Sequence, residues 1–166
     1  MSKIKHSSSY SGLQASKVVG ISYRQLDYWA RTDLIRPSIA DAHGSGSQRR
    51  YSYEDLLKLK LIKRLIDNGL SLQGVRRTIE SIDRIEDMTM ANAGLVFFGD
   101  SKSVLARDGE NLVDLLRGNQ MVFGMVLSLT DIKAELETEI VSIERFRAEK
   151  ETSADQNELT PARSAK

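Results

Sequence analysis

Apolar residues recur three or four positions apart along most of the first half of the chain, as they do on one face of a helix. In residues 53–67 this stripe consists of Leu56, Leu59, Ile62, Leu65 and Ile66. The same spacing predicts helices over 12–18 and 22–32 and a further helix that begins after Ser71. The first two of these, joined by a tight turn at 19–21, have the proportions of a helix-turn-helix.

Signals at the helix ends support these assignments. Ser22 with Gln25 three residues later has the pattern of a capping box, and Ser52 with Asp55 is a weaker version of it. The pair Asn68-Gly69 ends the third helix, because glycine readily adopts the left-handed conformation that closes a helix.

The segment 36–53 lies between two of these helices and is interrupted by the flexible run Gly-Ser-Gly-Ser at 44–47. Its flanks, Ile35–Ile39 and Gln48–Tyr51, are able to pair as a β-hairpin. A hairpin attached to a helix-turn-helix is a wing, and the alternative is an ordinary surface loop. The basic pair Arg49-Arg50 beside the tip favours the wing.

The second half of the chain has a different pattern. Short β-prone runs predict strands at Leu95–Gly99, Ser103–Ala106 and Met121–Leu127, with a short helix at 110–117. A long helix is expected over 130–150, with an apolar stripe that repeats every three or four residues. Such a stripe belongs either to the core of its own chain or to the seam between two chains.

These patterns predict a mainly α protein: an N-terminal winged helix-turn-helix, then a small α+β module that ends in a long helix. We expect a flexible arm at 1–10, a DNA-binding domain at 11–85 and a junction at 86–94. The α+β dimerisation or effector module would follow at 95–150, and a disordered tail at 151–166.

Charge divides the chain at the same place. Residues 1–85 carry 15 Lys and Arg against 8 Asp and Glu, a net charge of +7, whereas residues 86–166 carry 9 against 15, a net charge of −6. The absence of cysteine excludes disulfides and thiolate metal sites, and two histidines are too few for a His-rich zinc centre. We expect no cofactor, no metal and no catalytic residues. With neither a membrane-spanning run nor a signal-peptide core, a cytoplasmic, nucleoid-associated protein is expected.

The basic half contains residues suited to DNA. On helix 22–32 arginine can read guanine edges and tyrosine can contact phosphate or a thymine methyl group. Further cations lie on the wing and on the third helix, although such a run is also typical of a solvated helix face. The candidate DNA-binding residues are Tyr23, Arg24, Tyr28, Arg31, Arg49, Arg50, Lys58, Lys63 and Arg64.

The run from Ser11 to Ile85 resembles the winged-helix domain of the MerR transcription regulators in three phrases: ISYRQLDYWARTDLIRP, SQRRYSYEDL and LKLIKRLIDNGLSLQGVRRTIE. Tyr28-Trp29 stands in place of the family's Tyr-Tyr, and Arg49 with Tyr51 matches the wing's Arg-x-Tyr. Two departures are Asp27, where the family has a basic residue, and Ser47-Gln48, where it has Gly-Tyr.

The phrases GISYRQLDYWART, GSGSQR and DLLRGNQMVFGMVLS are similar to a cysteine-free actinobacterial branch that includes a mycobacterial regulator linked to growth and cell division. The resemblance implies a homodimer on pseudo-palindromic promoter DNA, which many members distort so that RNA polymerase engages both promoter elements. A two-fold DNA site calls for a two-fold protein, so the long helix is expected to form the dimer seam. The seam residues would be Leu129, Ile132, Leu136, Ile140 and Ile143.

Two other readings stay open. An excisionase-like architectural protein would use a similar winged helix to bend DNA but would need no dimer module. An interaction adaptor would offer its basic helices to an acidic protein. A small-molecule pocket is a further alternative to simple core packing for the apolar residues of the strands, which are Phe97, Phe98, Met121, Phe123 and Met125.

Overall fold

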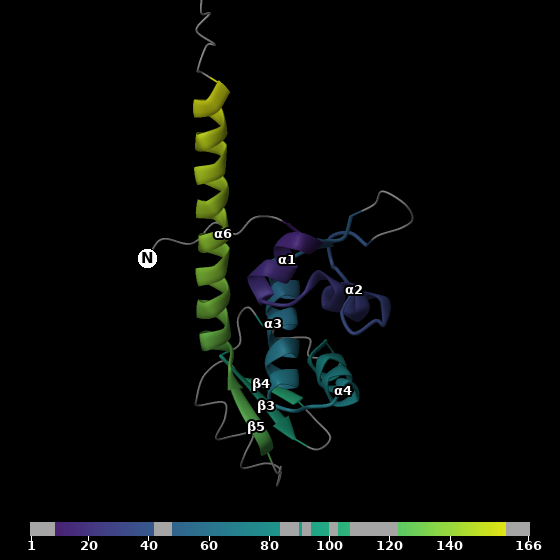
Figure 1. Cartoon of the computed structure of the whole chain (residues 1–166). Helices are drawn as coiled ribbons and strands as arrows, with labels where there is room; N and C mark the ends of the chain where they lie inside the picture. Colours follow the sequence, from purple (N-terminus) through teal and green to yellow (C-terminus); the bar gives the residue numbers. More distant parts are fainter. Residues whose placement is uncertain are drawn as a thin grey trace, which may run out of the picture.

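The computed structural model of the 166-residue chain describes residues 9–41, 48–83, 90, 94–99, 103–106 and 123–158. Helices are the dominant elements, and two small sheets accompany them (Figure 1). The helices are α1 (Gly12–Val19), α2 (Tyr23–Arg31), α3 (Tyr53–Asp67), α4 (Leu72–Asp83) and α6 (Leu129–Glu158). The strands are β1 (Tyr10–Ser11), β2 (Arg50–Tyr51), β3 (Leu95–Gly99), β4 (Ser103–Ala106) and β5 (Phe123–Ser128).

The predicted helix starts are confirmed. Ser22 begins α2 with a reciprocal capping box to Gln25, and Ser52 begins α3 in the same way with Asp55. Asp55 also accepts hydrogen bonds from the backbone N–H and the hydroxyl of Ser38, at 2.8 and 2.7 Å. This buried carboxylate therefore caps α3 and ties the wing segment to the start of that helix.

The base of the wing is present. Arg50 of β2 pairs with Ser11 of β1 on one side and forms an antiparallel bridge with Ala40 on the other. The wing tip at 42–47 lies outside the described residues. The boundary of the predicted flexible arm needs correction, because Tyr10 pairs with Tyr51 and is only 4% exposed.

The second half forms the antiparallel sheet β4-β3-β5, in which Phe97 pairs with Val104 and with Val126. The predicted strands β3 and β4 have the expected bounds, and β5 ends one residue later than predicted, at Ser128. The predicted helix at 110–117 lies outside the described residues. Helix α6 continues through 151–158, so the segment that was predicted as a disordered tail is partly helical.

Helix α6 packs its first half beside α1 and α3, and its second half extends beyond them (Figure 1). Its apolar residues Leu129, Ile132, Leu136 and Ile140 are at most 2% exposed and belong to the same core cluster as the apolar side chains of α1 and α3. The assignment of these four residues to a dimer seam is therefore corrected, because their surfaces are already buried within the chain. The fifth, Ile143, is partly buried against the same core.

Polar contacts hold α6 in this position. The carboxylate of Glu135 pairs with Arg64 and, over 3.6 Å, with Lys60, both on α3. The junction is also fixed at two points, since the N–H of Met90 donates to Glu54 over 2.8 Å and the N–H of Leu129 donates to the carbonyl of Gly94 over 2.8 Å. The first half of α6 is consequently part of the core of the helix-turn-helix domain.

This shared core predicts that Leu136→Ala lowers the free energy of unfolding by about 2–5 kcal/mol, the usual cost of emptying a buried leucine site. Urea denaturation of the full chain measures the change. Glu139→Ala, on the exposed face of the same helix, is the control and should alter stability by about 0.5 kcal/mol or less. Equal small losses for both variants would contradict the shared core.

Candidate nucleic-acid interface

The turn between α1 and α2 sets the angle at which α2 leaves the core. Gly20 has φ +79°, and its N–H donates to the carbonyls of Ser16 and Lys17 at 3.0 and 3.2 Å. A Cβ at this position would have space, with its nearest neighbour 3.9 Å away, so the positive φ is the reason for glycine here. The next residue, Ile21, donates to the same Ser16 carbonyl over 3.0 Å and completes the turn.

Helix α2 has one buried face and one exposed face. Leu26 and Trp29 are 1% and 4% exposed and join the core. The opposite face presents two tyrosines and two arginines, all of which the sequence predicted as DNA contacts. Tyr23 and Tyr28 are 56% and 53% exposed, large fractions for aromatic side chains, and Arg24 and Arg31 lie beside them.

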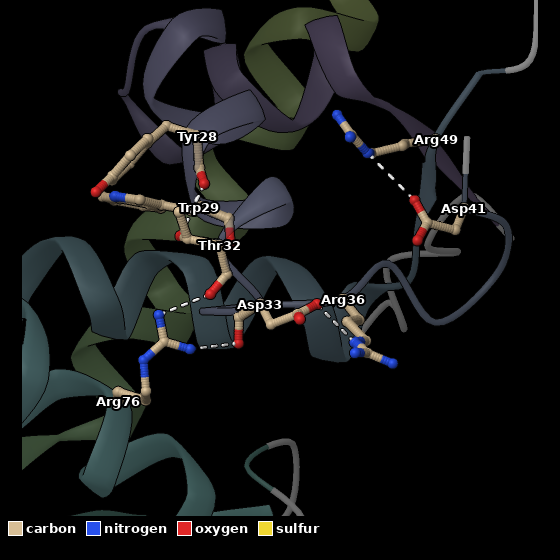
Figure 2. A network of polar contacts seen from close by, with 8 residues as sticks. All are labelled: Tyr28, Trp29, Thr32, Asp33, Arg36, Asp41, Arg49 and Arg76. Carbon is tan, nitrogen blue, oxygen red and sulfur yellow. Dashed lines mark hydrogen bonds and ion pairs between the residues drawn. The ribbon is translucent and has the colours of Figure 1, made fainter. Parts of the chain in front are cut away.

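The C-terminal end of α2 is fixed by a residue from another helix. Asp33 follows the C-cap Thr32 and has φ +54°, a left-handed conformation that Asp tolerates. Arg76 of α4 donates to the carbonyl oxygens of Thr32 and Asp33 at 2.7 and 3.0 Å, as Figure 2 shows. A cation at a helix C-terminus also complements the helix dipole.

The wing places its two arginines in different surroundings. Arg50 is half-buried at the centre of the wing base, with Ser11 and Ala40 on either side. Arg49 turns toward α2, donating from Nη1 to Asp27 over 2.7 Å and from Nε to Asp41 over 3.2 Å. Its contact with Asp41 is drawn in Figure 2.

Residues 10–82, the segment that contains this helix-turn-helix and wing, match the family described as MerR HTH family regulatory protein. This segment is therefore similar to the MerR-type DNA-binding domain. Part of the recognition prediction is therefore confirmed, while a place in the cell-division branch stays a prediction.

Curated relatives extend the similarity beyond the domain. HTH-type transcriptional regulators of Mycobacterium tuberculosis and Mycobacterium bovis are each 47% identical to this chain over 120 residues. The match covers 72% of this chain and 52% of the relative, so the chain spans about half the length of these relatives. The HTH-type transcriptional regulator GlnR of Bacillus anthracis is 32% identical over 59 residues, which cover 36% of this chain and 43% of that protein.

Two solved structures, both described as MerR family regulators, are similar to this chain. A MerR family transcriptional regulator from Bacillus cereus has a TM-score of 0.38 at 16% identity, with 95% of this chain and 87% of that chain covered. HiNmlR, described as a MerR family regulator lacking the sensor domain and bound to promoter DNA, has a TM-score of 0.40 at 17% identity, with 84% of this chain and 79% of that chain covered. The similarity to the MerR family rests on residues 10–82.

Within residues 10–82 the cations of α3 differ from those of α2. Three residues predicted as phosphate contacts are paired with acids of the chain itself: Lys58 with Asp83, Lys63 with Asp67 and Arg64 with Glu135. These pairs fasten α3 to α4 and α6 or lie along α3. The structure therefore brings together the α2 and wing residues of the predicted set and places the α3 cations in contacts within the fold.

Ionisation at the interface follows from these pairs. The hydrogen bond from Arg49 holds the pKa of the Asp27 carboxyl below its ordinary value, and the same bond raises the pKa of Arg49. Arg36 lowers the pKa of Asp33 in the same way. Burial raises the pKa of Tyr51 to about 12, so its hydroxyl is neutral at physiological pH.

Sequence reasoning missed two contributors, Arg76 and Asp41. Arg76 looked like one more surface cation, and no local pattern indicates that its partners are carbonyls more than forty residues earlier. Asp41 lies next to the wing tip and gives no signal of its own. The sequence did single out Asp27, because the resembled family has a basic residue at this position.

Other kinds of site receive less support. Among the described residues no cluster of His, Asp or Glu could hold a metal ion, and no helix is both long and apolar enough to cross a membrane. A groove along α6 is lined by Val141, Arg145 and Phe146, among others. The candidate residues for a small-molecule pocket have side chains outside the described part of the chain; they are Phe97, Phe98, Met121, Phe123 and Met125.

The contacts of Arg76 predict that Arg76→Gln lowers the free energy of unfolding by about 1–3 kcal/mol, because two carbonyls at the end of α2 lose a charged donor. Thermal or urea unfolding of the full chain checks this. The adjacent Arg77 is exposed, and Arg77→Gln is the matched control, with a change of about 0.5 kcal/mol or less. A control variant as unstable as Arg76→Gln would show that the loss does not come from these bonds.

Proposed function

We propose that this chain is a sequence-specific DNA-binding transcriptional regulator that acts as a homodimer on pseudo-palindromic promoter DNA. The observation that carries the proposal is the exposed face of α2, where Tyr23, Arg24, Tyr28 and Arg31 stand together beside the wing. In a helix-turn-helix the second helix enters the major groove, and these residue types read base edges and contact phosphates there. The names of the relatives, all HTH-type transcriptional regulators, support this reading.

Charge supports a nucleic-acid partner. The surplus of +7 in residues 1–85 is not spread evenly, since the α3 cations are paired with acids while the exposed face of α2 keeps its arginines at the surface. Each phosphate that such a cation neutralises releases counterions, which makes affinity depend strongly on salt. Arg31 pairs with Asp27 over 3.5 Å but is 73% exposed, so a phosphate can compete for it.

The homodimer is part of the proposal, with a different contact surface from the stripe buried in the core. The second half of α6 projects beyond the body of the chain and carries Phe146, which is 69% exposed, beside the partly buried Val141. A second copy of α6 would cover this apolar surface, and the two-fold symmetry of such a pair matches two half-sites.

Regulation through DNA distortion and contact with RNA polymerase completes the proposal. Two domains fixed rigidly to a paired α6 would hold two half-sites at a set spacing, and bending the DNA between them costs a few kcal/mol that their contacts must supply. An excisionase-like role is the second candidate, and it would be favoured if a monomer bent DNA. A role in growth and cell division stays a prediction.

For DNA binding we expect Arg24→Ala to weaken affinity for a selected duplex by about tenfold or more and to reduce the preference over a scrambled duplex, because arginine reads base edges. Fluorescence anisotropy with duplexes selected from a random pool by the full chain measures both effects. The wild-type affinity should fall steeply between 50 and 200 mM salt, by about a thousandfold for six phosphate contacts.

The control for this experiment is Arg77→Ala, which removes an exposed arginine of α4 outside the proposed face and should change affinity by about twofold or less. A wild-type affinity that is flat against salt, or equal for selected and scrambled duplexes, would contradict the proposed function.

For the dimer we expect Phe146→Asp to convert the protein to a monomer at micromolar concentration, because the substitution places a carboxylate in an apolar contact. Light scattering after size-exclusion chromatography measures the mass. Thr130→Asp adds the same charge at an exposed position near the start of α6 and should leave the dimer intact. A wild-type chain that is monomeric both free and on DNA would overturn this part of the proposal.

A further inference from the structure

A single guanidinium joins the recognition helix α2 to both legs of the wing. Arg49 donates to Asp27 on α2, which lies 22 residues earlier in the chain, over 2.7 Å. It also donates to Asp41 on the opposite leg of the wing over 3.2 Å. The Arg49 side chain is 18% exposed, and the side chains of Asp27 and Asp41 are 34% and 45% exposed.

An acid on a helix that faces DNA needs a physical reason, because a carboxylate near phosphate is repelled. The surroundings of Asp27 supply one. Its Oδ1 accepts from Arg49, and its Oδ2 lies 3.5 Å from the guanidinium of Arg31. Both carboxylate oxygens thus face cations of the chain itself, and the charge of Asp27 is used within the protein.

The surroundings of Arg49 differ from those of a cation that binds phosphate. Its side chain is mostly covered, and two carboxylates already neutralise it. A phosphate would have to displace one of them and separate the wing from α2. Arg50, the next residue, lies on the wing base without such a pair among the described residues, which leaves it suited to the phosphate contact.

We propose that Asp27 is a positioning residue that, through Arg49, fixes the wing relative to α2, so that Arg50 and the exposed face of α2 reach DNA together. Arg49 then serves as an internal tie between the wing and α2. The sequence had instead predicted a DNA contact for it. This inference rests on the proposed function and assigns a role to the residue at which the chain departs from the resembled family.

The physical consequence concerns preorganisation. A wing held in place before binding loses less conformational freedom when DNA is bound. Removing the tie therefore raises the dissociation constant but leaves the number of neutralised phosphates unchanged. That number sets the slope of the logarithm of affinity against the logarithm of salt concentration, which falls by about 0.9 for each neutralised phosphate.

The test is a double-mutant cycle of Asp27→Asn, Arg49→Gln and the two together, measured as affinity for a selected duplex over a salt series. We expect each single variant to weaken binding by about tenfold and the double variant to be no weaker than the worse single variant, because both break the same contact. All three should keep the wild-type salt slope. Thermal unfolding of the wild type and the variants without DNA shows whether a weaker affinity comes from a loss of folding.

Asp33→Asn is the matched control. Asp33 follows α2 and pairs with an arginine three residues later, Arg36, but it has no contact with Arg49 or Asp41 among the described residues. Asparagine tolerates the positive φ of residue 33. The control therefore removes an acidic side chain but leaves the contacts of Arg49 in place. Its affinity should equal or slightly exceed that of the wild type.

Two results would overturn the inference. A salt slope lower by about 0.9 in Arg49→Gln, with normal slope and tighter binding in Asp27→Asn, would identify Arg49 as a phosphate contact that Asp27 inhibits. Additive losses in the cycle would show that the two residues act separately.

A second measurement does not depend on DNA binding. The chain has no cysteine, so cysteines introduced at Tyr28 and Gln48, both exposed, carry spin labels at α2 and the wing. The distance distribution in the free protein should be narrow, and it should broaden with Asp27→Asn but not with Asp33→Asn. An unchanged distribution in Asp27→Asn would overturn the inference, whereas failure of wild-type DNA binding with the expected broadening would count against the proposed function alone.

Discussion

The packing of α6 against α1 and α3 is the contact on which the rest of the arrangement depends. Burial of its apolar stripe removes large side chains from water on three helices at once, which is the dominant favourable contribution to such a fold. Glu135 then adds ion pairs to Lys60 and Arg64 of α3. Because the long helix begins inside the core of the helix-turn-helix domain, the domain and the projecting second half of α6 keep a fixed relative orientation.

The same packing decides which charged residues are paired within the chain and which remain exposed. On α3 the cations meet acids of α4, of α6 or of α3 itself, so their charge contributes to the fold. On α2 the turn at Gly20 and the burial of Leu26 and Trp29 direct the arginines and tyrosines outward. Packing thus pairs the α3 cations with acids of the chain and leaves Arg24 and Arg31 of α2 exposed beside the wing.

Most of the local structure could be predicted. The capping boxes at Ser22 and Ser52 and the bounds of α3, β3 and β4 depend on interactions within a few residues, and these are legible in the sequence. The predictions that failed involve distant partners: Tyr10 was assigned to a flexible arm because its partner Tyr51 is forty residues away, and the stripe of α6 was assigned to a dimer because no local pattern says which surface covers it.

The sequence by itself determined where the helices begin and end, which face of α2 is apolar, the basic character of the first half and the exclusion of thiol chemistry. Each of these depends on residue type and spacing alone. Only the tertiary structure decided which charges remain exposed and that Arg76 donates to the carbonyls at the end of α2. It also decided that Arg49 pairs with Asp27 and Asp41. The reason is that an ion pair or a buried contact forms between whichever groups the packing brings within reach, and separation along the chain carries no information about that distance.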